Sequence, residues 1–212
     1  MQRRRISAVS RRSPLLAVVR RSPVRDAVDR DIRRVLQPRL DLPLPPGPAR
    51  TGDALHVLRQ PETRSLVYER LDLAGGIWRR LGRILRAVYR PQAALEFSCP
   101  DIGPGLIVSH GFATIVVAAA IGEDCLISQQ VTIGYSDKGG PPVLGDRVRI
   151  GAGAIVIGPI TLGDDSVVGA GAVVINDVPP GAVVGGVPAR VLAGAQDEFS
   201  ALRRSAPGPA EQ

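Results

Sequence analysis

Aliphatic side chains recur at intervals of six residues along the second half of this 212-residue chain. The residues that share this position are Ile102, Val108, Ile121, Ile127, Ile133, Leu144, Ile150, Val156, Leu162, Val168 and Val174. An α-helix repeats every 3.6 residues and a strand every two, so neither produces this period. A parallel β-helix does, because each unit supplies one short strand and one tight corner, and three units close one coil. The repeat therefore predicts a parallel β-helix with the aliphatic side chains inside.

Two interruptions of the repeat mark irregular places in the coil. The spacing is 13 residues between Val108 and Ile121, one more than two repeat units, and 11 residues between Ile133 and Leu144. The second interruption predicts that Tyr135–Val143 leaves the coil as a loop. Because the loop combines two glycines with two prolines in a regular solenoid, we expect it to contact a ligand. Ordinary surface variation is the alternative.

The composition fits such a core and excludes other classes. Aromatic residues make up only 3% of the chain and glycines number 24, as a narrow aliphatic prism with many corners requires. Cys99 and Cys125 are too few for a disulfide scaffold, and no Cys or His cluster has metal-ligand spacing. No apolar run approaches the ~20 residues of a membrane span. We expect no metal, no signal peptide, no integral membrane association and a reducing, cytoplasmic location.

The positive charge is concentrated near the N-terminus. Residues 1–50 contain 13 Arg and 4 Asp, a net charge of +9, so the rest of the chain carries −2 of the total of +7. This segment ends in the proline-rich run DLPLPPGPAR. We expect it to be mostly disordered, with one short helix near Val24–Leu36. Its arginines add affinity for phosphates, but no interleaved aromatic residues or known motif accompany them, so we expect no nucleic-acid partner.

An amphipathic helix is predicted ahead of the repeat. One face carries Ile77, Trp78, Leu81, Ile84, Leu85, Val88 and Tyr89, and the other carries Arg79, Arg80, Arg83, Arg86 and Arg90. A second helix is predicted near Glu62–Leu71. Either the two helices form a small cap whose apolar face packs on the β-helix, or the basic helix lies on a membrane surface. The expected organisation is an Arg/Pro-rich segment (1–50), a helical cap (51–94), the β-helix (95–194) and a flexible tail (195–212).

Four segments carry a resemblance to a known family. They are SHGFATIVV (109–117), IGEDCLISQQVTIGY (121–135), LGDRVRIGAGAIVIG (144–158) and VPPGAVVGGVPARVL (178–192). With these segments the chain resembles the hexapeptide-repeat acyltransferases, whose mainly β fold is a left-handed parallel β-helix, and within them the serine acetyltransferase-like branch. The resemblance implies acetyl-CoA as the acyl donor and a small acceptor with a hydroxyl group. It also implies an active site between the subunits of a homotrimer, or of a dimer of trimers.

The resemblance further implies the catalytic base. His110 stands in the HGFAT segment where family members carry their catalytic histidine, whereas His56 lies in the predicted helical region. A neutral imidazole takes the proton of the acceptor hydroxyl as its oxygen attacks the thioester. Glu96 is expected to orient His110 from an adjacent coil, with a solvent-exposed acid at the end of the first coil as the alternative. Ser109 stands where serine acetyltransferases carry an aspartate, so the resemblance leaves the acceptor open.

Coenzyme A is expected to bind mainly through small residues and the backbone. The candidates are Gly134, Gly151 and Ala152, which let a pantetheine arm lie close to the coil. Lys138 and Arg190 are candidate contacts to its phosphates, and a solvated surface charge is the alternative for each.

Three functions are consistent with these observations. The first is an acetyl-CoA-dependent O-acetyltransferase that acts on serine. The second is the same reaction on a sugar, a polysaccharide precursor or a specialised metabolite. The third is a non-catalytic trimeric scaffold, and the presence of His110 in its motif argues against it.

Overall fold

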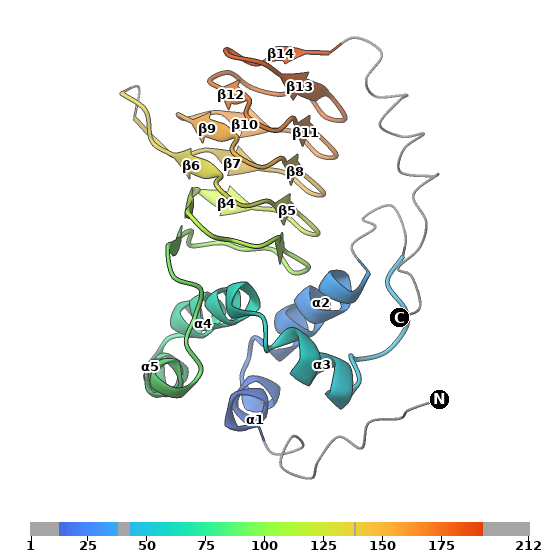
Figure 1. The fold of residues 1–212 in the computed structure, drawn as a ribbon, viewed down its shortest axis with the longest axis vertical. Helices are drawn as coiled ribbons and strands as arrows, with labels where there is room; N and C mark the ends of the chain where they lie inside the picture. Colours follow the sequence, from blue (N-terminus) through green and yellow to red (C-terminus); the bar gives the residue numbers. More distant parts are fainter. Residues whose placement is uncertain (1–12, 38–42, 138, 193–212) are drawn as a thin grey trace.

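The computed structural model describes residues 13–37, 43–137 and 139–192. Figure 1 shows a stack of short strands standing on a layer of helices. The helices are α1 (Pro14–Arg21), α2 (Arg25–Leu36), α3 (Thr51–Val57), α4 (Pro61–Ala74) and α5 (Gly76–Val88). Within the described ranges, no helix has the length and apolar character needed to cross a membrane.

The strands form three faces of one solenoid, which we name A, B and C. Face A contains β1 (Leu95–Ser98), β3 (Thr114–Val117), β6 (Thr132–Gly134), β9 (Ile155–Ile157) and β12 (Val173–Val174). Face B contains β4 (Ala120–Ile121), β7 (Val143–Leu144) and β10 (Thr161–Leu162). Face C contains β2 (Ile107–Val108), β5 (Leu126–Ile127), β8 (Arg149–Ile150), β11 (Val167–Val168), β13 (Val183–Gly185) and β14 (Arg190–Val191). Neighbouring strands are parallel except β13 and β14, which confirms the predicted left-handed parallel β-helix class.

The repeat positions form the core of the solenoid. Every aliphatic residue of the repeat is buried, with at most 8% of its surface exposed. Equivalent residues of successive coils are in register, since Ile127 pairs with Ile150 and Ile150 pairs with Val168. The predicted inward positions are therefore confirmed.

Replacing Ile150 with Ala is expected to lower the free energy of unfolding by about 3 kcal/mol, because deleting a fully buried aliphatic group leaves a cavity. Urea denaturation measures this change. Ile175→Ala is the matched control, since Ile175 is 41% exposed, and it should change the free energy of unfolding by less than about 0.5 kcal/mol. Equal effects of the two substitutions would mean that the six-residue register is wrong.

The two interruptions of the repeat have different structural origins. The corner between β2 and β3 is two residues longer than its equivalents and the following corner is one residue shorter. The inward residue of β3 is Val116, eight residues after Val108 and five before Ile121. In the second interruption β7 begins at Val143, so the loop is Tyr135–Pro142 and the predicted loop was one residue too long.

Residues 14–36 are helical, so the expectation that the first 50 residues are mostly disordered is wrong for this part. The short helix expected near Val24–Leu36 is α2, whereas α1 was not predicted. Both helices contribute to a second apolar core, formed by Leu15, Leu16, Val19, Val28, Ile32, Ala54, Val57, Leu58, Val67, Tyr68 and Leu71. Residues 1–12, 38–42 and the predicted tail at 195–212 lie outside the described residues.

The two helices predicted ahead of the repeat are α4 and α5, and they pack differently from the expectation. α4 contacts β1 and β2, whereas α5 packs on α4 and α1. The apolar face of α5 therefore does not cover the β-helix: Ile77, Ile84 and Val88 are 60%, 67% and 74% exposed. The reason is that α4 already occupies the end of the first coil (Figure 1).

A buried ion pair attaches the helices to the first coil. Arg70 of α4 donates hydrogen bonds of 2.7 and 2.9 Å to the carboxylate of Asp31 in α2, and it also donates to the carbonyl oxygens of residues 102 and 103. The Asp31 carboxylate in turn accepts the backbone N–H groups of Gly105 and Leu106. The side chains of Arg70 and Asp31 are 4% and 1% exposed, so each depends on the other for its neutralising charge.

A second contact joins α2 to a corner of the next coil. Both oxygens of Asp124 accept hydrogen bonds from Arg30 and Arg34. Burial alone would raise the pKa of Asp124, but the hydrogen bonds from the two guanidinium groups outweigh it and hold this pKa below its usual value. Arg30 and Asp124 are 94 residues apart in the sequence, so this source of order for the Arg-rich segment is not visible locally.

Candidate active site

His110 lies at the corner where the chain passes from face C to face A in the first coil. β2 ends at Val108 and β3 begins at Thr114. The backbone of His110 has a φ of 64°, a left-handed conformation that residues other than glycine rarely adopt. Gln130, at the equivalent corner of the next coil, has a φ of 59°, so this conformation belongs to the tight corner. His110 is exposed, and within the described chain its side chain makes no hydrogen bond or ion pair.

The corner of His110 folds against the start of α4. Gly111 has a φ of 59°, and a Cβ atom there would lie 3.1 Å from side-chain atoms of Glu62, Leu95 and Val108. Glycine therefore allows the longer corner to pack closely. Glu62 is a carboxylate next to this corner that the sequence analysis did not single out, because it belongs to a different element and no motif contains it.

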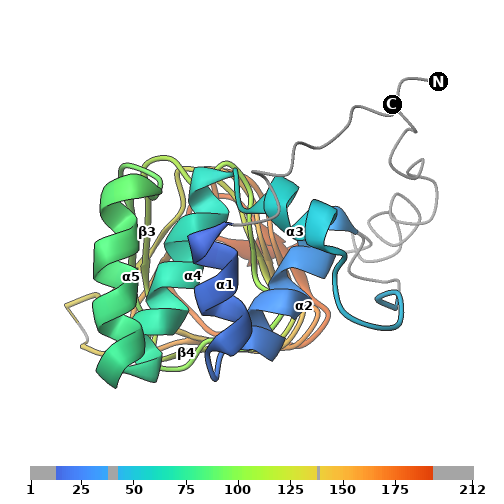
Figure 2. The same ribbon diagram turned by 90° about the horizontal axis from the view of Figure 1, so that it is seen from below.

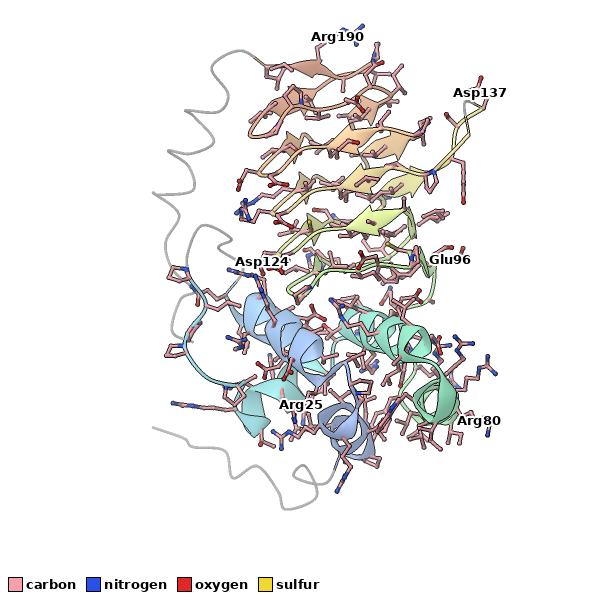
Figure 3. The ribbon with its side chains drawn as sticks, turned by 180° about the vertical axis from the view of Figure 1, so that it is seen from behind. Arg25, Arg80, Glu96, Asp124, Asp137 and Arg190 are labelled. Carbon is pink, nitrogen blue, oxygen red and sulfur yellow. The ribbon has the colours of Figure 1, made fainter. Side chains whose placement is uncertain are left out.

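Glu96 lies on the outward side of face A. It stands in β1 opposite Ile115 of β3, is exposed, and is labelled in Figure 3. No hydrogen bond joins its carboxylate to His110 among the described residues. The role predicted for Glu96 in orienting the imidazole stays a prediction, and Glu62 is a second carboxylate on the other side of the same corner.

A strip of small residues continues above His110 on the same edge of the solenoid. We name it the corner strip; it consists of Gln129, Ala152, Gly153, Ala170 and Gly171. The N–H of Gly153 donates to the carbonyl oxygen of Gln129 over 3.0 Å, and the N–H of Gly171 donates to that of Ala152 over 2.9 Å. A Cβ atom on Gly153 or Gly171 would meet nothing within 4 Å. The corner strip is therefore an open surface along which an extended ligand can lie.

Gly151 and Ala152, two of the predicted cofactor contacts, lie on the same edge as His110. A Cβ atom on Gly151 would come within 2.6 Å of the backbone nitrogen of Ala170. Coil stacking alone therefore requires glycine there. Ala152 is partly exposed and belongs to the corner strip, so it is the better placed of the two for contact with a ligand.

Gly134 and the loop lie at the opposite edge of face A. The chain enters face A at the corner of His110 and leaves it after Gly134, at the end of β6. A Cβ atom on Gly134 would meet nothing within 4 Å, so packing does not require glycine at this position. Figure 3 shows the loop with Asp137 projecting beyond the face that carries Glu96. Within one chain, the loop does not cover His110.

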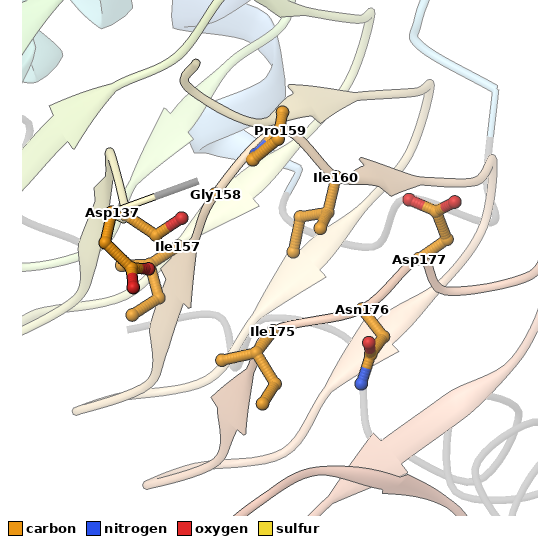
Figure 4. Close-up of a pocket in the computed structure, with 9 residues that line it drawn as sticks. Asp137, Ile157, Gly158, Pro159, Ile160, Ile175, Asn176 and Asp177 are labelled. Atoms are coloured by element: carbon orange, nitrogen blue, oxygen red, sulfur yellow. The ribbon is translucent and has the colours of Figure 1, made fainter. Parts of the chain in front are cut away.

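A pocket of about 350 Å³ lies at the base of this loop (Figure 4). It is lined by Ser136, Asp137, Ile157, Gly158, Pro159, Ile160, Ile175, Asn176 and Asp177. The Asp177 carboxylate accepts the backbone N–H of Thr161 over 2.7 Å. The pocket combines an apolar wall with two carboxylates, so it suits an apolar or hydroxyl-bearing group better than a phosphate.

The two predicted phosphate contacts are not brought together with His110. Lys138 lies outside the described residues. Arg190 is exposed in β14, at the tip of the stack farthest from the helices (Figure 3), and its guanidinium donates to the carbonyl oxygen of Ala189 over 2.9 Å.

The two cysteines do not supply a nucleophile. Burial raises the pKa of both thiols, and that of Cys125 reaches about 12. Both are therefore protonated at neutral pH. In the part of the chain that the structure describes, no group of three or more His, Cys, Asp or Glu side chains is placed to hold a metal ion.

Comparisons with known proteins agree with this geometry. Residues 141–176 match the family described as bacterial transferase hexapeptide (six repeats). A serine acetyltransferase of Mycobacterium tuberculosis is 41% identical over 138 residues, which cover 58% of this chain and 58% of that protein. The chain therefore spans little more than half the length of this relative.

Solved structures share the fold over a larger part of the chain. The structure of Neisseria gonorrhoeae serine acetyltransferase in complex with serine is 26% identical with a TM-score of 0.59, and the match covers 84% of this chain and 72% of that one. A serine acetyltransferase in complex with CoA is 23% identical with a TM-score of 0.59, over 86% of this chain and 80% of that one. The second similarity concerns the fold alone.

Proposed function

Because this chain is a hexapeptide-repeat protein on the serine acetyltransferase branch, we propose that it transfers an acetyl group from acetyl-CoA to the hydroxyl group of a small acceptor, with serine as the first candidate. The observation that carries the proposal is the exposed His110 at the foot of the open corner strip. The serine and the CoA named for the solved relatives supply the two candidate substrates. The two free cysteines, both buried, support a cytoplasmic reaction.

In the proposed reaction, His110 acts as general base and then as general acid. Its neutral imidazole takes the proton of the acceptor hydroxyl while the oxygen attacks the thioester carbonyl carbon. The tetrahedral intermediate then collapses, the carbon–sulfur bond breaks, and the imidazolium returns the proton to the departing thiolate. Such proton transfer contributes about 10² to 10⁴ in rate. Either Glu62 or Glu96 stabilises the imidazolium as it forms.

The pantetheine arm of coenzyme A is proposed to lie along the corner strip. The strip runs over successive coils from Gln129 to Gly171, in line with His110. Its small side chains allow a close approach, and Ala152 lies at its centre. A thioester at the lower end of such an arm would reach His110, while the phosphates would lie higher on the stack, toward the end that carries Arg190.

A second copy of the chain is proposed to complete the site, in a homotrimer. His110 and the loop Tyr135–Pro142 lie at opposite edges of face A, so one chain alone does not enclose a substrate. Between these edges Ile115 and Ile155 are 42% and 36% exposed, and both stand in register with Thr132 on the outward side of the face. An apolar outward face is expected to be covered by a neighbouring subunit, whose loop would then approach His110.

A sugar-like acceptor is the second candidate. Ser109 precedes His110 where the resemblance leads one to expect an aspartate that holds the amino group of serine. A hydroxyl at this position favours an acceptor that offers further hydroxyl groups, such as a sugar or a polysaccharide precursor.

Incubation of the purified chain with acetyl-CoA and a panel of acceptors tests the proposal. The panel consists of serine, threonine, monosaccharides and nucleotide sugars, and the readouts are free thiol and the mass of the product. We expect one acceptor class to release thiol and gain one acetyl group. Stable trimers that release no thiol with any acceptor would favour the non-catalytic scaffold.

Shortening the loop is expected to weaken acetyl-CoA binding without unfolding the protein. Removal of residues 136–140 restores the six-residue spacing and leaves three connecting residues, as between β9 and β10. Surface loops add little to core stability, so thermal unfolding should be nearly unchanged. The KM for acetyl-CoA should rise about tenfold, which corresponds to a loss of about 1.4 kcal/mol. Unchanged kinetics in the folded variant would show that the loop does not contact the cofactor.

A further inference from the structure

The outer side of α5 carries an apolar stripe that no described part of the chain covers. The stripe consists of Ile77, Ile84 and Val88, whose exposed fractions are 60%, 67% and 74%. These residues lie on one side of the helix, since seven and eleven residues correspond to about two and three turns. Three large aliphatic side chains at this exposure form an apolar patch of the kind that marks an interaction site.

The stripe lies on the end of the molecule that faces away from the β-helix. Gly82, on the other side of α5, approaches Leu71 and Tyr68 of α4. α4 in turn packs on β1 and β2, so it separates α5 from the solenoid. Figure 2, a view from below, shows α5 and α1 side by side on this end. This placement distinguishes the stripe from face A, where subunits of the proposed trimer would meet.

The charges around the stripe are all positive. The sequence of α5 contains four arginines and no acidic residue. Arg79 and Arg86 are held by Asp72, whereas Arg80 and Arg83 are exposed and make no hydrogen bond or ion pair with any described residue. The neighbouring helix α1 adds arginines at positions 20 and 21, both exposed.

We propose that this end of the protein docks on the surface of an anionic phospholipid bilayer. The stripe inserts at the boundary between headgroups and acyl chains, and Arg80 and Arg83 contact lipid phosphates. The combination of apolar and basic groups favours lipid over a second copy of the same surface. Packing of α5 on α5 would cover the apolar side chains, but it would bring unpaired guanidinium groups together.

Flotation of the full-length protein with vesicles tests the proposal. One set is phosphatidylcholine with about one third phosphatidylglycerol, and the other is phosphatidylcholine alone. We expect binding to the anionic vesicles that weakens as salt is added. Ile84→Ser/Val88→Ser and Arg80→Gln/Arg83→Gln should each reduce the partition coefficient about tenfold or more. Substitutions at these exposed positions are not expected to unfold the protein.

Matched controls lie at the opposite end of the stack, where Figure 3 places Arg190. Val191→Ser removes an aliphatic side chain that is 56% exposed, and Arg190→Gln removes an exposed arginine; both should keep wild-type vesicle binding. Equal binding of the stripe variants and the controls would overturn the proposal. Assemblies larger than a trimer that form without vesicles and are lost in Ile84→Ser/Val88→Ser would also overturn it, since the stripe would then be a protein interface. Neither readout depends on acetyl transfer, so failure of the proposed reaction would leave this result unaffected.

Discussion

His110→Ala is expected to lower kcat by at least about 10² while the KM for acetyl-CoA stays nearly unchanged. The imidazole acts on the proton of the acceptor hydroxyl, so its loss removes transition-state stabilisation and little cofactor binding. His110 is exposed and makes no hydrogen bond or ion pair with the described residues, so its replacement is not expected to unfold the protein. Initial rates of thiol release at varied acetyl-CoA and acceptor concentrations measure both constants.

The chain offers a matched control for this substitution. His56, the only other histidine, is exposed in α3, and His56→Ala should keep the wild-type rate. The wild-type rate should fall on acidification as the imidazole takes up a proton, and this dependence should be absent from the residual rate of His110→Ala. If His110→Ala kept more than half of the turnover, His110 would not be the base.

Glutamate substitutions separate the two carboxylates at the corner of His110. Glu62→Gln and Glu96→Gln leave the shape of each side chain nearly unchanged and remove its charge. The residue that supports the imidazolium should lower kcat and shift the acidic limb of the rate profile, whereas the other should do neither.

The six-residue repeat predicted the solenoid well because its period leaves one solution. Once Ile150 points inward, Ile127 and Val168 must do so as well, since they stand in register on the neighbouring coils. The same reasoning missed the shape of the corner at His110. Only the sum of two corner lengths is visible between Val108 and Ile121, and the sum conceals one long corner and one short one.

The order of the N-terminal helices was not predictable from local composition. An Arg-rich segment that ends in prolines has the composition of a disordered chain. Its charges are neutralised by Asp124, which lies in a coil 90 or more residues later. The amphipathic pattern of α5 predicted its helix correctly, but not its partner, because the pattern does not specify whether α4, the solenoid or another molecule covers the apolar side.

The candidate site was predictable in part. His110 came from its motif, and the structure places it at an accessible corner next to the corner strip. The separation of Gly134 from His110 was not predictable, because the sequence does not reveal at which edge of a face each residue lies. This separation is the reason that the proposed site requires two chains.

Arg70→Met is expected to destabilise the protein by about 4 kcal/mol. It removes the counter-ion of Asp31, which is 1% exposed, and a buried charge without its partner costs about 3–5 kcal/mol. The carbonyl oxygens of Ile102 and Gly103 also lose their donor. Urea denaturation measures the loss. Arg25→Met is the matched control, because Arg25 and Asp26 form a pair whose side chains are 65% and 87% exposed, and its effect should stay below about 1 kcal/mol.

A double substitution identifies the source of this loss. Asp31→Asn keeps an oxygen acceptor for the N–H groups of Gly105 and Leu106 and removes the charge, so Asp31→Asn/Arg70→Met should be more stable than Arg70→Met alone. Equal stability of the single and double variants would mean that the lost hydrogen bonds to the coil matter more than the unpaired charge. Gly105 and Leu106 lead directly into β2 and the corner of His110. Loosening of this pair should therefore lower acetyl transfer at temperatures where the upper coils are still folded, because the helices support the part of the solenoid that carries the proposed base.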